Sequence, residues 1–210
     1  MTDYAFVSAR GGSGKTTLAL NFAGLLASRG ERVLLVDDDE SGGAALAFGA
    51  LARRAGHVLP FAILPALSRG FESVVHDCSP GVVGRARRLP GDVLIMPTLC
   101  DQASHVLLFQ ALEDLQQAGR LAVVVPNRVR LDRADQARLL ADQFPGQAYF
   151  RDRAALAQAL SAGTTLFCPG NSKSRWAAAA RDEFCAAMAP VLSDPAPETG
   201  NDVPKAPVAA

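Results

Sequence analysis

Two spacings of apolar residues alternate along most of the chain. Short apolar runs are typical of buried strands, and longer stretches with apolar positions three or four apart are typical of helices. The pattern predicts strands over residues 5–7, 32–36, 58–64, 73–76, 92–96, 121–125 and 147–150, and helices over residues 18–28, 105–117, 132–143, 154–160 and 174–188. This alternation predicts a single α/β domain, with a mostly parallel sheet and helices on both of its faces.

Prolines and a change of composition set the expected boundaries. Pro60 places the strand over 58–64 at an edge of the sheet, and Pro97 and Pro126 are expected to end the strands before them. After Pro190 the residues are mainly Pro, Ala, Gly and Asn, with few large apolar side chains. Such a segment cannot bury enough surface to order itself, so we expect a folded domain over 1–190 and a disordered tail over 191–210.

Composition and charge exclude several classes of protein. Of the 210 residues, 49% are hydrophobic and 20% charged, which is enough apolar material for one large core. Lys and Arg balance Asp and Glu at 21 each, so bulk positive charge does not drive nucleic-acid binding, although a local basic patch stays possible. No apolar run is long enough for a membrane-spanning helix, and Met1–Tyr4 does not begin a signal peptide, so we expect a cytoplasmic protein without a membrane partner.

The sequence Gly11-Gly12-Ser13-Gly14-Lys15-Thr16-Thr17 lies between the first predicted strand and the first predicted helix. Glycines allow a tight turn that directs several backbone N–H groups at one anion, and the helix N-terminus adds partial positive charge. Lys15 can reach the β- and γ-phosphates of a nucleotide, Thr16 can ligate Mg²⁺, and Thr17 can bind the α-phosphate. The sequence therefore predicts a phosphate-binding loop that binds a nucleotide with Mg²⁺, and a P-loop NTPase domain.

This loop, read from Arg10, resembles the deviant Walker-A loop K-G-G-x-G-K-T-T of the ParA/MinD family of P-loop ATPases. Four further motifs resemble that family in the same order: residues 30–39 (GERVLLVDDD), 74–81 (VVHDCSPG), 91–98 (GDVLIMPT) and 124–128 (VVPNR). The resemblance runs from Tyr4 to about Met188, and the short chain is most similar to the small partition-type members. Residues 39–43 (DESGG) depart from the family's D-P-Q-G, and Cys78-Ser79 replaces its common Thr-Pro.

The resemblance implies roles for the charged residues of these motifs. Lys15 and Asp39 would act in catalysis, with Asp39 placing the attacking water. Asp77 would hold Mg²⁺ through water, together with Thr16. Arg10 replaces the family's signature lysine, which reaches across a nucleotide-sandwich homodimer to the partner's phosphates. Arginine keeps the charge but is longer and forked, so Arg10 either acts as a finger in trans or leaves hydrolysis slow.

Base, DNA and partner contacts are also implied by the resemblance. Asn127 would bind adenine through its amide. The late Cys168-Pro169-Gly170 loop would run past the base, which Pro169 would contact through its backbone. Partition-type members bind DNA non-specifically as ATP dimers, and the basic residues favoured for this contact are Arg151, Arg153, Lys173 and Arg175. A cargo-linked partner protein would stimulate hydrolysis.

The function predicted from these motifs is a ParA-like ATPase that positions a plasmid, a chromosome or a protein body. A MinD-like membrane switch needs an amphipathic C-terminal helix, which the proline-rich end does not provide. An iron–sulfur ATPase needs paired cluster cysteines, which Cys78 and Cys100 do not match. A ligase such as dethiobiotin synthase lacks the double glycine of this loop, and an ATP-binding scaffold with little hydrolysis is the alternative if Arg10 is inactive.

Overall fold

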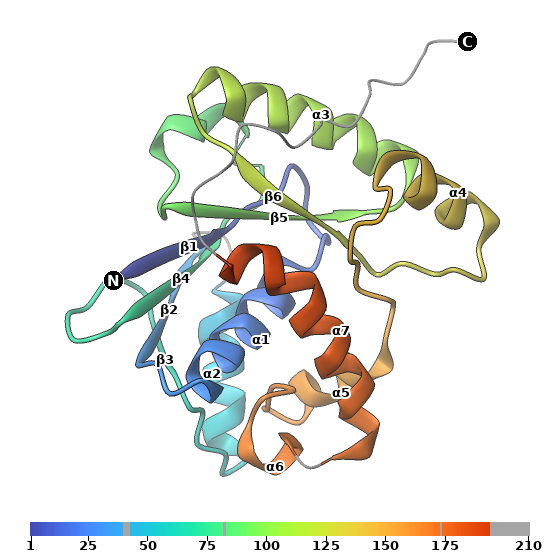
Figure 1. Cartoon of the computed structure of the whole chain (residues 1–210). Helices are drawn as coiled ribbons and strands as arrows, with labels where there is room; N and C mark the ends of the chain where they lie inside the picture. The colour runs from blue at the N-terminus through green and yellow to red at the C-terminus, as the bar shows by residue number, and fades with distance from the viewer. Residues whose placement is uncertain (40–42, 82, 173, 194–210) are drawn as a thin grey trace.

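A single six-stranded sheet organises the protein, which we describe from a computed structural model over residues 1–39, 43–81, 83–172 and 174–193. The strand order is β3-β2-β4-β1-β5-β6, and every neighbouring pair is parallel. The strands are β1 (Thr2–Phe6), β2 (Val33–Asp38), β3 (Ala62–Leu64), β4 (Ser73–Cys78), β5 (Val93–Leu99) and β6 (Ala122–Asn127). The predicted fold class, an α/β domain with a parallel sheet, is confirmed (Figure 1).

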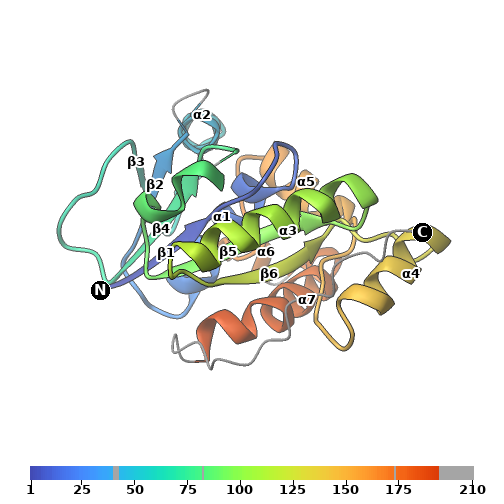
Figure 2. The same ribbon diagram turned by 90° about the horizontal axis from the view of Figure 1, so that it is seen from above.

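Helices connect the strands and cover both faces of the sheet. They are α1 (Lys15–Ser28), α2 (Ala44–Arg54), the 3-10 helix η1 (Val83–Arg88), α3 (Gln102–Gln117), α4 (Ala134–Gln143), α5 (Ala154–Ser161), α6 (Pro169–Ser172) and α7 (Arg175–Leu192). One core joins the sheet to α1, α2, α5 and α7, and a second core joins its other face to α3 and α4. Figure 2 shows α3 and α7 on opposite sides of β5 and β6.

Burial on both faces explains why the central strands read as continuous apolar runs. Leu34 and Leu35, neighbours on β2, point to opposite faces, and both are fully buried, as are Val74 and Val75 on β4. The same burial makes polar residues within these strands informative, because a polar group taken out of water needs a partner. No helix among the described residues is long and apolar enough to cross a bilayer.

Two strands continue through prolines that were expected to end them. β5 runs to Leu99 and pairs with β6 beyond Pro97, at a level where β1 has already ended at Phe6. β6 includes Pro126 and is an edge strand, where a missing amide N–H interrupts no ladder on the open side. The predicted edge position of β3 is confirmed.

The strand predicted over 147–150 is wrong. The segment lies beside the end of β6, where Phe150 N–H donates to Pro126 O at 2.9 Å, and Val129 and Arg151 form one isolated bridge. Upstream, the Gln147 side-chain amide, in place of a backbone group, donates to Val124 O. A side-chain hydrogen bond thus satisfies the carbonyl group of Val124 on the open edge of β6, where none of the described residues adds a further strand.

The last helix passes the expected boundary of the folded domain. α7 includes Pro190 and ends at Leu192, and Val191 is 2% exposed in the core. The predicted tail, from residue 194 onward, lies outside the described residues, and its disorder stays a prediction.

Candidate functional site

The candidate site lies where the carboxyl ends of the parallel strands meet, the edge at which open α/β sheets bind ligands. The glycine-rich loop leaves β1 at this edge and ends at Gly14, which is the N-cap of α1. Gly12 and Gly14 have φ of +81° and +92°, values that favour glycine. The loop therefore has the strand–loop–helix context that its sequence predicts.

Asn127, at the end of β6, is packed against this loop. Its Nδ2 donates to the carbonyl oxygen of Ser13 at 2.7 Å, and its Oδ1 accepts from the backbone N–H of Arg128 at 2.9 Å. A Cβ atom built on Gly14 would lie 2.3 Å from Nδ2, so only glycine leaves room for this contact. The amide predicted to bind adenine thus supports the loop, and its role toward a base stays a prediction.

Lys15 and Asp77 lie buried behind the loop, with 8% and 1% of their surfaces exposed. Burial raises the pKa of Asp77 to about 6, because the ionised carboxylate is poorly solvated. The Thr16 hydroxyl and the Lys15 charge lower that pKa in part, while Asp37 and Asp39 raise it. The structure therefore brings Lys15, Thr16 and Asp77 together, as the motifs predict.

The donor groups at this point suit Mg²⁺. Both carboxylate oxygens of Asp77 are buried, and the Thr16 hydroxyl beside them is too poorly placed to satisfy either one, which is costly without a cation or water. Among the same residues, no three His, Cys, Asp or Glu side chains are grouped to hold a metal ion. A single carboxylate with a hydroxyl fits Mg²⁺, which keeps several waters and takes other oxygens from bound phosphates.

The end of β2 places the carboxylates of Asp37 and Asp39 beside Asp77. Asp37 pairs with Asp77 in the strand register, and its two oxygens accept from the backbone N–H groups of Asp39 at 3.2 Å and Leu46 at 2.8 Å. Asp37 therefore connects the end of β2 to the first turn of α2. Asp39 is half-buried, and its Oδ1 accepts from the Ser79 hydroxyl at 3.3 Å.

Sequence reasoning missed the partner of Asp38. The Oδ2 atom of Asp38 lies 2.6 Å from Nδ1 of His76, a residue of β4 that is 3% exposed. The available signal was a histidine directly after Val74 and Val75 in a predicted buried strand, because a buried polar group is nearly always hydrogen-bonded.

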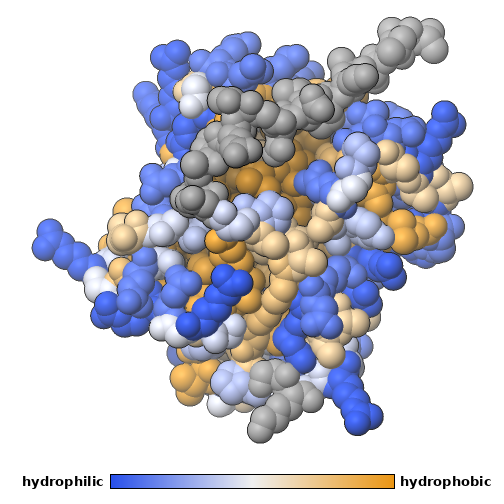
Figure 3. Space-filling view, viewed as in Figure 1, coloured by the Kyte–Doolittle hydropathy of each residue, from blue (hydrophilic) through white to orange (hydrophobic). Residues whose placement is uncertain are grey.

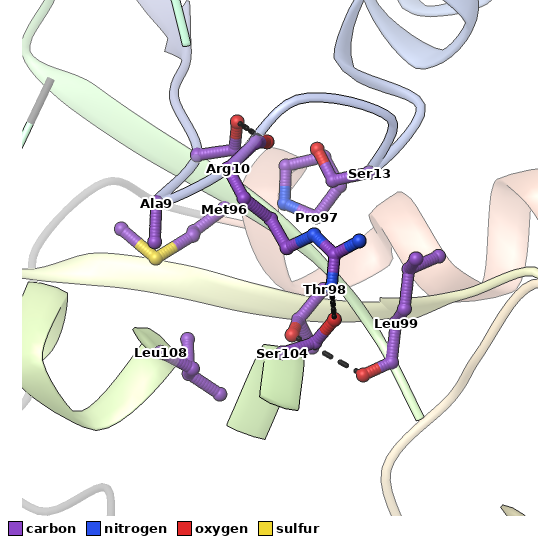
Figure 4. A pocket seen from close by; sticks show the side chains of 10 residues that line it. Ala9, Arg10, Ser13, Met96, Pro97, Thr98, Leu99, Ser104 and Leu108 are labelled. Carbon is purple, nitrogen blue, oxygen red and sulfur yellow. Dashed lines mark hydrogen bonds between the residues drawn. The ribbon is translucent and has the colours of Figure 1, made fainter. Parts of the chain in front are cut away.

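Arg10 points toward the start of α3 (Figure 4). Its Nη1 donates to Ser104 Oγ at 3.3 Å and lies 3.9 Å from Asp101 Oδ1, with 43% of the side chain exposed. Asp101 is the N-cap of α3 and accepts from the Ser104 N–H at 2.8 Å. Arg10 lines a cavity of about 10 Å³ beside the loop, together with Ser13 and Thr98. That is room for one water, not for a nucleotide.

The late loop before α6 packs against α1. Leu166 N–H donates to Asn21 Oδ1 at 2.9 Å, while Asn21 Nδ2 donates back to Thr17 O at 2.8 Å. Pro169 begins α6 and is exposed at its surface. This brings the late loop to the helix that follows the phosphate-binding loop, and the contact of Pro169 with a base stays a prediction.

Most arginines in the predicted DNA cluster are not free positive charges. Arg153 Nη2 lies 2.7 Å from Glu183 Oε2, and Arg151 Nε lies 3.8 Å from the same oxygen. Arg175 is exposed, and Lys173 lies outside the described residues. By contrast, the exposed arginines of η1 have no ion pair with any described carboxylate; they are Arg85, Arg87 and Arg88.

The four cysteines are free thiols. Cys78, Cys100 and Cys168 are buried and Cys185 is half-buried. Burial raises the pKa of Cys78 to about 12 and that of Cys100 to about 11, so neither is a thiolate near neutral pH. They act as small packing residues.

Comparisons with known proteins agree with this geometry. Residues 4–164 match the CbiA family, described as the CobQ/CobB/MinD/ParA nucleotide binding domain. Over 133 residues the chain is 35% identical to the chromosome-partitioning ATPase Soj of Thermus thermophilus. That match covers 58% of this chain and 53% of Soj, so it spans about half the length of this relative.

Similar solved structures support the fold. The septum site-determining protein MinD of Pyrococcus horikoshii, complexed with Mg-ADP, superposes with a TM-score of 0.70 at 17% identity, over 94% of this chain and 99% of MinD. A plasmid partition protein of Borrelia burgdorferi, bound to AMPPNP, superposes with a TM-score of 0.69 at 13% identity, over 91% of this chain and 98% of the other. At such identities these likenesses concern the fold alone.

Proposed function

Because the chain belongs to the CobQ/CobB/MinD/ParA nucleotide-binding family, we propose that it is an ATPase of the partitioning type that switches between ATP and ADP states to position a cargo. The observation that carries this proposal is the loop at Arg10–Thr17, with Lys15 and Thr16 beside a buried Asp77 carboxylate whose oxygens accept no well-formed hydrogen bond from the described residues. That arrangement is suited to a nucleotide phosphate and its cation.

The residues of the site divide the work of phosphoryl transfer. The loop amides and Lys15 hold the phosphates, while Thr16 and a water held by Asp77 complete a Mg²⁺ site. Bound Mg²⁺ supplies charge neutralisation on the phosphates. Asp39, at the end of β2 and outside the buried pair Lys15–Asp77, orients the attacking water.

Arg10 takes part through a homodimer in this proposal. In the single chain its guanidinium is half-exposed and lies at the start of α3, held by contacts that are weak at such exposure. It is therefore available to a second copy of the chain, whose transferring phosphate it would stabilise as an arginine finger.

The ATP dimer binds DNA without sequence preference, and a cargo-linked protein stimulates hydrolysis and release. Support for DNA binding comes from exposed arginines with no carboxylate partner among the described residues, on η1 and at Arg175. Phosphate contacts need only positive charge, so a neutral chain can bind through one local patch.

The test is a titration of arbitrary duplex DNA with the full chain, with ATP, ADP or no nucleotide, at low and high salt. The proposal expects binding with ATP alone, weakened steeply by salt, and lost in Lys15→Ala. Binding with no nucleotide dependence would contradict the switch. ATP-dependent association with anionic vesicles instead of DNA would favour the membrane alternative, and ATP binding without turnover would favour a scaffold.

A further inference from the structure

One side-chain hydrogen bond joins β2 to β4 just before the acidic residues Asp39 and Asp77. In the β2–β4 register His76 is opposite Val36 and Asp38 is opposite Cys78, so both side chains project from one face of the sheet, two residues apart. His76 Nδ1 lies 2.6 Å from Asp38 Oδ2. His76 comes directly before Asp77, and Asp38 directly before Asp39.

Ser79 makes a second connection on the other side of Asp77. Its hydroxyl oxygen lies 3.2 Å from the carbonyl oxygen of Asp38 and 3.3 Å from Oδ1 of Asp39. His76 and Ser79, which flank Asp77 and Cys78 in the sequence, therefore both contact the end of β2. The β2–β4 register ends at the Asp38–Cys78 pair, so side-chain contacts help to place Asp39 relative to Asp77. They include the His76–Asp38 contact, the two Ser79 contacts and the hydrogen bond from the Asp39 N–H to Asp37 Oδ1.

Packing alone does not explain a histidine at this position. The second ring nitrogen of His76 is buried and has no hydrogen-bond partner among the described residues, which an apolar side chain of similar size would avoid. Buried polar pairs often add little stability over apolar replacements. Their hydrogen bond is directional, however, and hydrophobic contact is not, so the pair can fix the direction of a backbone segment.

We propose that His76 is a positioning residue for Asp39 and acts through Asp38. This inference rests on the proposed function, in which Asp39 orients the attacking water. Loss of the contact lets the end of β2 move away from Asp77, which slows hydrolysis. Nucleotide affinity changes little, because the loop amides lie between β1 and α1 and Lys15 begins α1, so neither is part of β2.

The experiment compares His76→Leu, His76→Asn and Asp38→Ala in the full chain. Asn places an amide Nδ2 where histidine has Nδ1, so it keeps a donor to Asp38, whereas Leu keeps only the volume. We expect single-turnover ATP hydrolysis to fall about tenfold in His76→Leu and in Asp38→Ala, since small displacements of reacting groups are costly. His76→Asn should stay within about threefold, and affinity for a fluorescent ATP analogue within about twofold in all three.

A measurement without nucleotide tests the contact directly. In ¹⁵N-histidine NMR spectra of the free protein, Nδ1 of His76 should carry a proton, as a donor to Asp38 must, and its signal should shift in Asp38→Ala. Asp38 is 35% exposed on its side chain, so its replacement opens no cavity in the core and should disturb folding less than His76→Leu. An unprotonated Nδ1 would overturn the proposal.

The kinetic outcomes separate this inference from the proposed function. If Asp39→Ala hydrolyses ATP at the wild-type rate, the catalytic assignment of Asp39 fails, and the positioning role fails with it. If Asp39→Ala is slow while Asp38→Ala hydrolyses normally, the positioning role alone is wrong. A parallel loss of rate and ATP affinity in His76→Asn and His76→Leu would likewise reject it, since that pattern indicates a general loss of structure.

Discussion

Charged residues gather in two regions of the molecule, and they are held in different ways. At the carboxyl edge of the sheet, Lys15 and Asp77 are buried, and the strand register and the turn of the loop decide where they lie. At the surface formed by the 151–153 segment and α7, Arg151 and Arg153 share Glu183 and lie partly in solvent.

The contrast shows that a motif of fixed spacing predicts a site better than a local cluster of basic residues does. In the first region, backbone geometry fixes each group, so a motif of fixed spacing predicts the arrangement. In the second region, a carboxylate some thirty residues away along the chain offsets the charge, which no local count of arginines reveals. Variants at the edge should therefore have large effects and variants at the surface small ones.

Gly14→Ala should have the largest effect, because its φ of +92° is strained for alanine and the new Cβ would clash with Asn127 Nδ2. We expect the free energy of unfolding of the nucleotide-free protein to fall by about 2–4 kcal/mol, from backbone strain and the displaced buried hydrogen bond. Urea unfolding measures this change.

Gly11→Ala is the matched control in the same loop. Gly11 has no positive φ, and a Cβ there would meet no atom within 4 Å. Its effect on unfolding should stay below about 0.5 kcal/mol. Equal losses for the two variants would show that glycine content, and not the fit of Asn127 under Gly14, determines the stability of the loop.

Sequence predicted the sheet and its edge strand β3 from local apolar runs, and it predicted the grouping of Lys15, Thr16 and Asp77 from the resemblance of their motifs to those of a known family. It did not predict that β5 passes Pro97, since that depends on where the neighbouring strand β1 ends. It also missed the contact between Asp38 and His76, which only the β2–β4 register brings together. The failures share one cause: each depends on a partner distant in the chain.

Asp77→Asn should stabilise the nucleotide-free protein. It tests the buried region by removing a charge whose burial is costly. The folded protein raises the pKa of Asp77 to about 6, so it binds this proton more tightly than the unfolded chain does. Stability from this group is therefore greatest in acid and declines as pH rises from about 4 to about 6. The variant should gain about 1–3 kcal/mol above pH 7 and almost nothing below pH 4.

Urea unfolding with EDTA across pH 4–8 measures this difference. Mg²⁺ with ATP should reduce the difference in the free energy of unfolding between the variant and the wild type. Ligand binding stabilises the wild type, whereas the variant has lost a cation-binding carboxylate. A difference that does not depend on pH would mean that the carboxylate of Asp77 is not the destabilising group.

The smallest effects are expected for paired arginines at the surface. Arg87 and Arg88, on η1, are exposed without a carboxylate partner among the described residues, whereas Arg151 and Arg153 share Glu183. In DNA titrations with ATP, Arg87→Ala/Arg88→Ala should weaken binding about five- to tenfold and lower the salt slope by about two, one per lost phosphate contact. Arg151→Ala/Arg153→Ala should change affinity less than about threefold, as expected for charges that are already offset.

Each pair removes two positive charges, so the net charge of the two variants is equal and only the position of the loss differs. Equal weakening would mean that DNA senses total charge and that the pairing with Glu183 is irrelevant. Stronger weakening from Arg151→Ala/Arg153→Ala would mean that Glu183 releases these arginines when DNA binds. Adding Glu183→Gln to Arg151→Ala/Arg153→Ala distinguishes these two cases: the lost negative charge should strengthen binding if DNA senses total charge, and should have little effect if Glu183 acts only through the two arginines.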